Sequence, residues 1–155
     1  MNSVHKVCPC VVRSRQGRLE ILVFEHPLAG HQLVKGTVEA GEDLPNAALR
    51  ELAEESGLTP SMGMVLGRKL GVLDFEVSPS ERQHWHLYLV QQDVHSTQAL
   101  PEHWVHEATG SPEEEGLSFR FYWTDLQHFE ASLFHPRFVT VLQWIASLSA
   151  KEIQS

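Results

Sequence analysis

Three glutamates, Glu51, Glu54 and Glu55, stand close together near the middle of the chain. On a helix, residues three and four positions apart share one face, so these carboxylates would form a single row. Each like-charged pair destabilises a helix by roughly 0.2–0.5 kcal/mol, and the repulsion grows in a cleft that excludes water. A divalent cation that prefers oxygen ligands removes this repulsion. The spacing therefore points to a magnesium or manganese site, or else to an ordinary solvated helix face.

A longer pattern around these residues distinguishes the two interpretations. The pattern consists of Gly36, Glu42, Arg50-Glu51-Leu52, Glu54-Glu55 and Gly57-Leu58. They fit G-x5-E-x7-R-E-U-x-E-E-x-G-U throughout, where U is a bulky aliphatic residue. Seven named residues, at about 7% usage each, would agree by chance on the order of once in 10⁸ windows. The segment from Gly36 to Leu58 thus resembles the box of the Nudix hydrolases.

The resemblance implies a pyrophosphohydrolase that uses Mg²⁺, with Mn²⁺ as a substitute. Glu51, Glu54 and Glu55 are then the expected metal ligands, and Glu54 is either a ligand or the base that orients the attacking water. Arg50 and Glu42 are expected to position these carboxylates. The implied reaction is attack of water at phosphorus, which cleaves the phosphoanhydride bond of a nucleoside diphosphate linked to another moiety and gives two phosphorylated products.

Residues outside this row complete the expected site. Gly36 is expected to let the backbone approach the metal or a phosphate closely. Lys35, which precedes it, either contacts a substrate phosphate or is a solvated loop residue. Many Nudix enzymes take a further glutamate from a later loop, and residues 113–115 are all glutamates here. Of these we expect Glu115 to assist catalysis.

Aromatic and histidine residues admit two interpretations each. His84 and His86 share a strand face with Tyr88, so they either line the substrate pocket or are partly buried sheet residues. The same choice, between stacking on a base and filling the core, applies to Phe75, Trp85 and Trp104.

The elements that must position these residues follow from periodicity and turn residues. Strands are expected at 5–13 and 19–25 as a hairpin, then at 65–75 and 83–94, and again at 119–123. A helix begins at the capping residue Asp43 and ends at Gly57, and a second helix covers 136–149. Residues 96–116 are expected to be a long irregular, acidic connection. This order predicts one α/β domain over residues 1–155, with helices packed on a mixed sheet. The resemblance implies the α/β/α sandwich of the Nudix family.

Composition limits the partners. With 20 acidic and 12 basic residues, the net charge is -8. Such a chain is poorly suited to non-specific binding of nucleic acid or of anionic membranes, whereas a small polyanion can bind where metal ions reverse the local charge. The sequence has no signal-peptide or membrane-spanning segment, which predicts a cytoplasmic protein. Cys8 and Cys10 lie on one strand face and are expected to be buried thiols.

Two other functions stay open at this point, as does the substrate. One alternative is a Nudix-like module that binds a nucleotide without catalysis, and the other is an isomerase that needs a cysteine in its pocket. Nucleoside triphosphates, dinucleoside polyphosphates, nucleotide sugars and damaged nucleotides are all compatible with the motif. Because Nudix proteins often dimerise, a homodimer is a further expectation.

Overall fold

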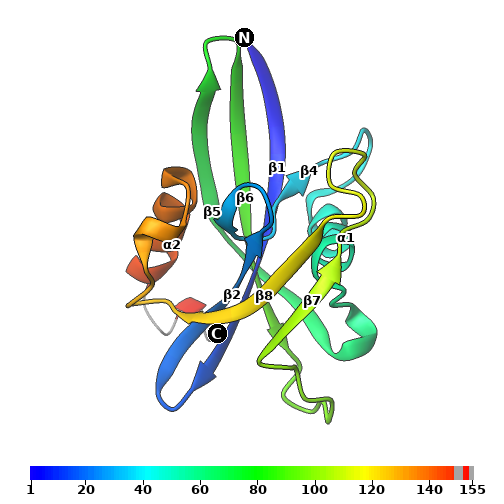
Figure 1. Cartoon of the computed structure of the whole chain (residues 1–155), viewed down its shortest axis with the longest axis vertical. Helices are drawn as coiled ribbons and strands as arrows, with labels where there is room; N and C mark the ends of the chain where they lie inside the picture. Colours follow the sequence, from blue (N-terminus) through cyan, green and yellow to red (C-terminus); the bar gives the residue numbers. More distant parts are fainter. Residues whose placement is uncertain (149–151, 154–155) are drawn as a thin grey trace.

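The computed structural model describes residues 1–148 and 152–153. Over residues 1–148, two α-helices and two short 3-10 helices accompany eight strands (Figure 1). The strands are β1 (Asn2–Arg15), β2 (Arg18–His26), β3 (Gly30–Gln32), β4 (Gly36–Thr37), β5 (Met64–Ser78), β6 (Glu81–Gln92), β7 (His103–Glu107) and β8 (Ser118–Asp125). The helices are α1 (Leu44–Ser56), η1 (Pro60–Met62), η2 (Ala131–Leu133) and α2 (Pro136–Ser147).

Strand β1 organises the sheet because it pairs with two distant parts of the chain. Its first ten residues run parallel to β6, from the pair Asn2 and Glu81 onwards. From Val12 onwards it pairs antiparallel with β2, which confirms the predicted hairpin. The sheet order is β5-β6-β1-β2-β8-β7, with β3 beside β2 and β4 beside β1. The result is a mixed sheet, as predicted.

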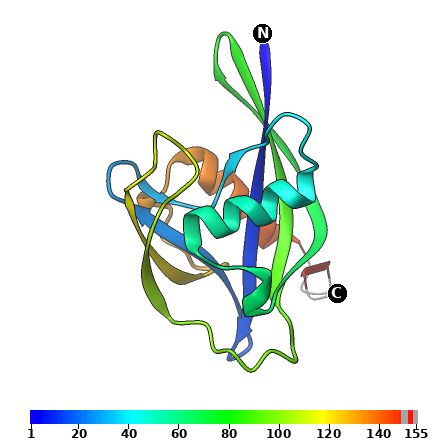
Figure 2. The same cartoon turned by 90° about the vertical axis from the view of Figure 1, so that its right-hand side faces the viewer.

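The two faces of the sheet carry separate cores. On β1, Cys8 and Cys10 face α2, whereas Val7 faces α1. Both cysteines are free and buried, as expected. The helices cover opposite faces (Figure 1), and a quarter turn shows α1 lying across the strands in front (Figure 2). The predicted α/β/α arrangement is therefore confirmed.

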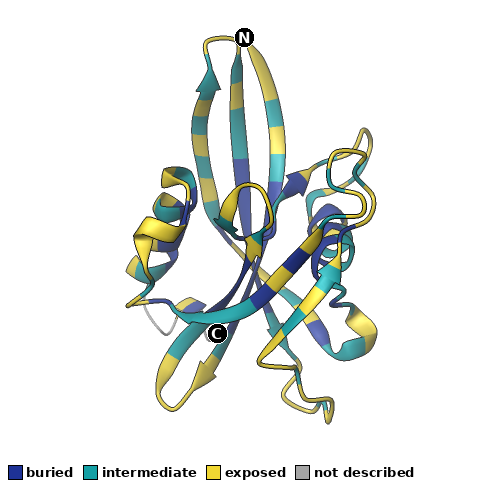
Figure 3. Cartoon of the chain, viewed as in Figure 1, coloured by how far each residue is buried: buried dark blue, intermediate teal, exposed yellow. Residues whose placement is uncertain are grey.

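The ends of β1, β5 and β6 project beyond the rest of the chain as an arm. Along this arm exposed and half-buried residues alternate (Figure 3), because neither helix covers the full length of these strands. Lower down, β1 and β6 are buried on both faces. On the side of the sheet that carries α1, the surface of these strand ends is therefore not covered by the helix.

Some predicted boundaries were wrong. Residues 96–116 are not irregular throughout, because His103–Glu107 forms β7 and pairs with β8. Gly36 and Thr37, which the sequence does not assign to a strand, form the short strand β4. Helix α2 ends at Ser147, and residue 149, the predicted end, lies outside the described residues. Within the part of the chain that the structure describes, no helix is long and apolar enough to cross a membrane.

Candidate active site

Helix α1 begins and ends where its capping residues predicted. Asp43 precedes the first turn, and its side chain accepts a hydrogen bond from the backbone of Asn46 at 2.8 Å. Pro45 occupies the first turn, where no intrahelical donor is required. Gly57 has a φ of 80° and donates to the carbonyl of Ala53, which closes the last turn. The glutamates of the box are therefore held on a helix with fixed ends.

The carboxylate row lies against the sheet and not in solvent. Glu55 is 3% exposed and Glu51 is 8% exposed, comparable to the core residues Ala48 and Leu52. At about 100° per residue, Glu55 lies close to the centre of this buried arc. Leu49, just outside this arc, is only half-buried. The interpretation as a solvated helix face is therefore wrong.

Arg50 cross-links the carboxylates around it. Its Nε and Nη2 donate to the two oxygens of Glu42 at 2.7 and 2.9 Å. Its Nη1 donates to Glu51 at 2.8 Å and to Glu54 at 3.1 Å, and Nη2 also donates to the carbonyl of Thr37 at 3.0 Å. These bonds hold the pKa of Glu42 near 2, so Glu42 is ionised and fixed.

Glu55 is a buried carboxylate with an unsatisfied oxygen. Its Oε2 has no hydrogen-bond partner. Burial, followed by the nearby charges of Glu114 and Glu51, raises the pKa of Glu55 well above its usual range, while a hydrogen bond from the backbone of Lys35 acts in the opposite direction. Burial also raises the pKa of Glu51. For Glu51 burial outweighs the opposing effect of Arg50, whereas Oε2 of Glu55 has no positively charged partner.

Two carboxylates of α1 pack directly against glycines, in space that any other residue's side chain would fill. A Cβ on Gly36 would lie 1.8 Å from Cδ of Glu51, and a Cβ on Gly110 would lie 2.2 Å from Cδ of Glu54. Gly110 also has a φ of +85°, which disfavours any side chain there. The expectation for Gly36 was close approach to a metal or phosphate, and the structure shows that the group it admits is the carboxylate of Glu51.

The late acidic loop reaches the site through Glu114. This residue is half-buried and lines the cleft with Glu51, and burial together with the charge of Glu51 raises its pKa. Glu115, the residue expected from the sequence, is exposed and does not line the cleft. Glu113 is at the rim and accepts a hydrogen bond from the Ser111 hydroxyl at 2.8 Å. The turn therefore directs Glu114, and not Glu115, toward α1.

Lysines provide the positive charge of the cleft. Lys35 lines it, with its Nζ 4.3 Å from the centre of the Trp85 ring and 5.4 Å from that of Phe138. Burial lowers the pKa of Lys35. Lys6, which the sequence did not single out, also lines the cleft and donates to the Thr37 hydroxyl at 2.6 Å. Its signal was its place on β1, opposite Thr37 at the start of the box.

The aromatic candidates for base stacking are instead packed against one another. Trp85 is 1% exposed and contacts Phe75 and Phe138. Trp104 stacks on Phe121, and its indole nitrogen donates to the last turn of α1 at 2.9 Å. These contacts favour the core interpretation for all three predicted residues.

The resulting acidic cleft has a volume of about 550 Å³. Within residues 1–148 and 152–153, no three His, Cys, Asp or Glu side chains are already arranged around one metal position. Arg50 holds one oxygen each of Glu51 and Glu54. Nevertheless the donors suit a hard cation, because they are crowded carboxylate oxygens and one, on Glu55, has no other partner. The lining residues are Lys6, Gln32, Lys35, Gly36, Thr37, Val38, Glu39, Arg50, Glu51, Gly110, Ser111, Pro112, Glu113 and Glu114.

An α/β/α sandwich with a carboxylate-bearing helix beside such a cleft defines a class of phosphoanhydride hydrolases. The NUDIX domain matches residues 4–145, and the chain belongs to this family. An RNA pyrophosphohydrolase of Roseobacter denitrificans is 30% identical over 134 residues, which are 84% of this chain and 71% of the relative. The chain is a Nudix hydrolase.

Solved structures agree in fold. The Ap4A hydrolase of C. elegans superposes with a TM-score of 0.64 at 19% identity, covering 94% of this chain and 98% of that one. The NUDIX domain of Shewanella oneidensis NrtR, in complex with ADP ribose, gives 0.61 at 12% identity, covering 100% and 90%. At these identities the likeness concerns the fold alone.

Proposed function

We propose that this Nudix hydrolase requires Mg²⁺, with Mn²⁺ as a substitute, and cleaves the phosphoanhydride bond of a nucleoside diphosphate linked to another moiety. One observation supports the metal requirement above the others. The carboxylate of Glu55 is buried beside Glu51 and has one oxygen without any partner. A buried carboxylate in this state is costly unless it is protonated or coordinates a cation.

Residues in the cleft and the carboxylates of α1 beside it have distinct roles in this proposal. Glu51, Glu54 and Glu55 would hold the cation, which, when bound, neutralises the diphosphate and acidifies water. Arg50 keeps Glu51 and Glu54 oriented through the bonds at 2.8 and 3.1 Å. Lys35 lines the cleft, but its Nζ lies over the Trp85 ring on the α2 face, so its proposed contact with a phosphate oxygen requires the side chain to turn toward the cleft.

The reaction needs one base near the carboxylate cluster. Water attacks phosphorus, the bond from phosphorus to the bridging oxygen breaks, and the water proton must leave. Glu114 is placed to accept it, since this half-buried side chain lines the cleft and has a raised pKa. Glu54 accepts a hydrogen bond from Arg50 and packs against Gly110. These contacts fix its carboxylate, which suits a metal ligand that orients water. We therefore propose Glu114, in place of Glu115, as the general base.

The alternatives differ in what they require of the site. An isomerase that relies on a cysteine is not supported, because Cys8 and Cys10 are buried and burial raises the pKa of both thiols. A nucleotide sensor without catalysis needs a cleft, but it has no chemical need for a second buried carboxylate beside Glu55. The hydrolase accounts for both the cleft and the carboxylates.

The test is hydrolysis of a panel with Mg²⁺ and with EDTA. The panel comprises ADP-ribose, diadenosine tetraphosphate, a nucleoside triphosphate and a 5′-triphosphorylated oligoribonucleotide. We expect metal-dependent release of a phosphorylated product from at least one compound, and a loss of about 10³-fold or more in Glu55→Gln. Glu76→Gln, an exposed change on β5, is the matched control and should retain full activity. Binding of a compound by both proteins without turnover would establish the sensor instead.

A further inference from the structure

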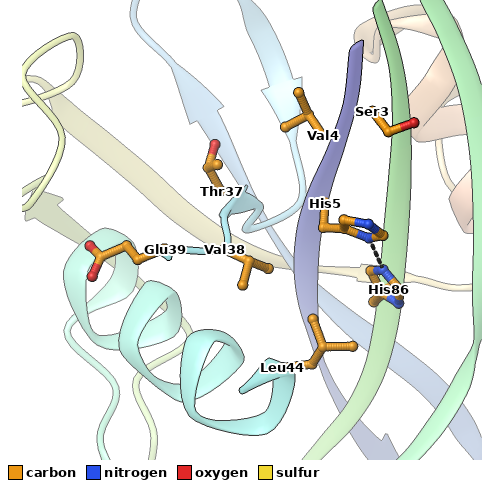
Figure 4. Close-up of a pocket in the computed structure, with 8 residues that line it drawn as sticks. All are labelled: Ser3, Val4, His5, Thr37, Val38, Glu39, Leu44 and His86. Atoms are coloured by element: carbon orange, nitrogen blue, oxygen red, sulfur yellow. Dashed lines mark hydrogen bonds between the residues drawn. The ribbon is translucent and has the colours of Figure 1, made fainter. Parts of the chain in front are cut away.

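A second hollow adjoins the acidic cleft on the α1 face of the sheet, and we name it the β1–α1 pocket. It lies between strands β1 and β6 on one side and the segment that leads into α1 on the other (Figure 4). Its volume of about 510 Å³ falls within the range of small-molecule sites. The lining residues are Ser3, Val4, His5, Thr37, Val38, Glu39, Leu44 and His86.

The β1–α1 pocket is continuous with the acidic cleft. Thr37, Val38 and Glu39 line both hollows, so this short segment is their common wall. Lys6 marks the junction, because it lines the cleft and its Nζ donates to the Thr37 hydroxyl at 2.6 Å. One extended ligand can therefore occupy both hollows. Where the hollows meet, it would lie beside the positively charged ammonium group of Lys6.

The two hollows differ in chemistry. The cleft is lined by lysine, arginine and glutamate side chains, which suit a diphosphate with its counter-ions. In the β1–α1 pocket, Val38 and Leu44 lie across from the imidazoles of His5 and His86 (Figure 4). The two rings are joined by a hydrogen bond of 2.9 Å between Nδ1 of His5 and Nε2 of His86. Aliphatic walls with ring nitrogens at one side suit a flat nitrogen heterocycle, which can stack and form hydrogen bonds.

Each of the two sites contains or adjoins a buried polar atom that has no hydrogen-bond partner in the described part of the chain. Among the residues that the structure describes, the buried side-chain atoms without a hydrogen-bond partner are Oε2 of Glu55 and Nδ1 of His86. Buried polar groups are nearly always paired, so each unpaired atom calls for an explanation, and a bound ion or ligand at that point supplies one. His86 is 8% exposed, and its ring is held through Nε2. The exceptions thus fall in the carboxylate cluster and in the wall of the neighbouring pocket.

We propose that the β1–α1 pocket binds the nucleobase of the substrate while the diphosphate crosses Thr37 into the acidic cleft. This inference rests on the proposed hydrolase function and adds where the nucleoside lies. Val38 and Leu44 contact one side of the base, and His5 and His86 the other. The chain therefore selects diphosphates that carry a nucleoside over diphosphates without a base.

Binding without hydrolysis tests this assignment directly. The probes are the α,β-methylene diphosphates of adenosine, guanosine, cytidine and uridine, compared by calorimetry with methylenediphosphonate, all with Mg²⁺. We expect at least one nucleotide to bind about tenfold or more tightly than the probe without a base. Leu44→Trp fills the pocket and should abolish this advantage while leaving methylenediphosphonate affinity within about twofold. Leu28→Trp, at a side chain that is 80% exposed, is the matched control and should keep the advantage.

A second measurement on the unaltered protein covers the case in which Leu44→Trp does not fold. The ring resonances of His5 and His86 should shift with the bound nucleotide and stay in place with methylenediphosphonate. Retention of the full nucleotide advantage in folded Leu44→Trp would overturn the proposal, as would shifts confined to the Trp85 indole on the opposite face. Failure of the hydrolase proposal gives a different result, namely base-dependent binding without turnover of any compound.

Discussion

Replacing Gly36 by alanine inserts one methyl group into the space of the Glu51 carboxylate. The new Cβ would lie 1.8 Å from Cδ and 2.0 and 2.2 Å from the two oxygens. Ordinary contact begins near 3.4 Å, so the carboxyl group must retreat by about 1.6 Å. Gly36 does not have a positive φ, so the backbone itself accepts alanine. The perturbation therefore acts on Glu51 and on little else.

The size of the effect follows from what this retreat breaks. The bond from Nη1 of Arg50 to Glu51, at 2.8 Å, is lost, and a hydrogen bond to a charged group is worth about 1.5–3 kcal/mol when buried. Because Arg50 is partly exposed, we expect the free energy of unfolding to fall by about 1 kcal/mol. A catalytic group misplaced by more than about 1 Å lowers turnover by about 10²-fold. The variant should thus be folded and nearly inactive.

A double-mutant cycle checks this explanation. Urea unfolding without metal and steady-state hydrolysis are measured for Gly36→Ala in the natural chain and in a Glu51→Ala background. In that background the methyl group meets no carboxylate, so we expect no further loss of stability or of residual activity. Gly67→Ala, where the added Cβ would lie 3.2 Å from the Leu89 carbonyl on a remote strand, controls for glycine replacement. Equal losses in both backgrounds would refute a mechanism that acts through Glu51.

Three further predictions concern the base, the arginine and the histidine. Glu114→Gln should lower kcat about 10-fold or more while Glu115→Gln changes it less than about twofold, and the reverse order in a kinetic assay would contradict our choice of base. Arg50→Lys should lower the free energy of unfolding, measured in urea, by about 2 kcal/mol, because a lysine ammonium cannot replace a guanidinium that donates hydrogen bonds to four groups. A loss under about 0.5 kcal/mol would speak against this explanation. Burial and the charge of Lys69 lower the pKa of His86 from 6.5 to about 4, so its protonation opposes folding and stability should fall as pH drops from 6.5 to 4. His86→Gln should reduce that loss by about 2 kcal/mol in pH-dependent unfolding, and an unchanged slope would exclude His86 as its source.

The helix that carries the chemistry could be predicted because its signals are local. Asp43 and Gly57 fix its ends within one short segment, and the carboxylate spacing follows from 3.6 residues per turn. What the spacing could not show is which face is buried. Helical projection sets Leu49 among the apolar residues, but packing against Val7 and Tyr88 turns Ala47 and Ala48 inward and takes the carboxylates with them.

The choice between neighbouring glutamates could not be predicted, because it depends on one turn. The backbones of Glu114 and Glu115 both donate to the carbonyl of Ser111, and Gly116 donates to Ala108. In this tight turn successive side chains point in different directions. The side chain of Glu114 therefore enters the cleft, whereas that of the next residue, Glu115, is exposed to solvent. Strand β7 was missed for a related reason. Its half-buried side is made of Trp104 and His106, which do not form the apolar alternation that identifies a strand.

The parallel pairing of β1 with β6 has a consequence for how the protein forms. Asn2 pairs with Glu81 and Val11 with Val90, so the contacts span about half of the chain. Long-range pairing of this kind is slow, because the intervening loop must close before any contact is gained. Ala47 and Ala48 of α1 pack against Val7 and Tyr88, one from each of these strands. We therefore expect the helix to dock only after synthesis has passed β6, which makes the site one of the last parts of the molecule to mature.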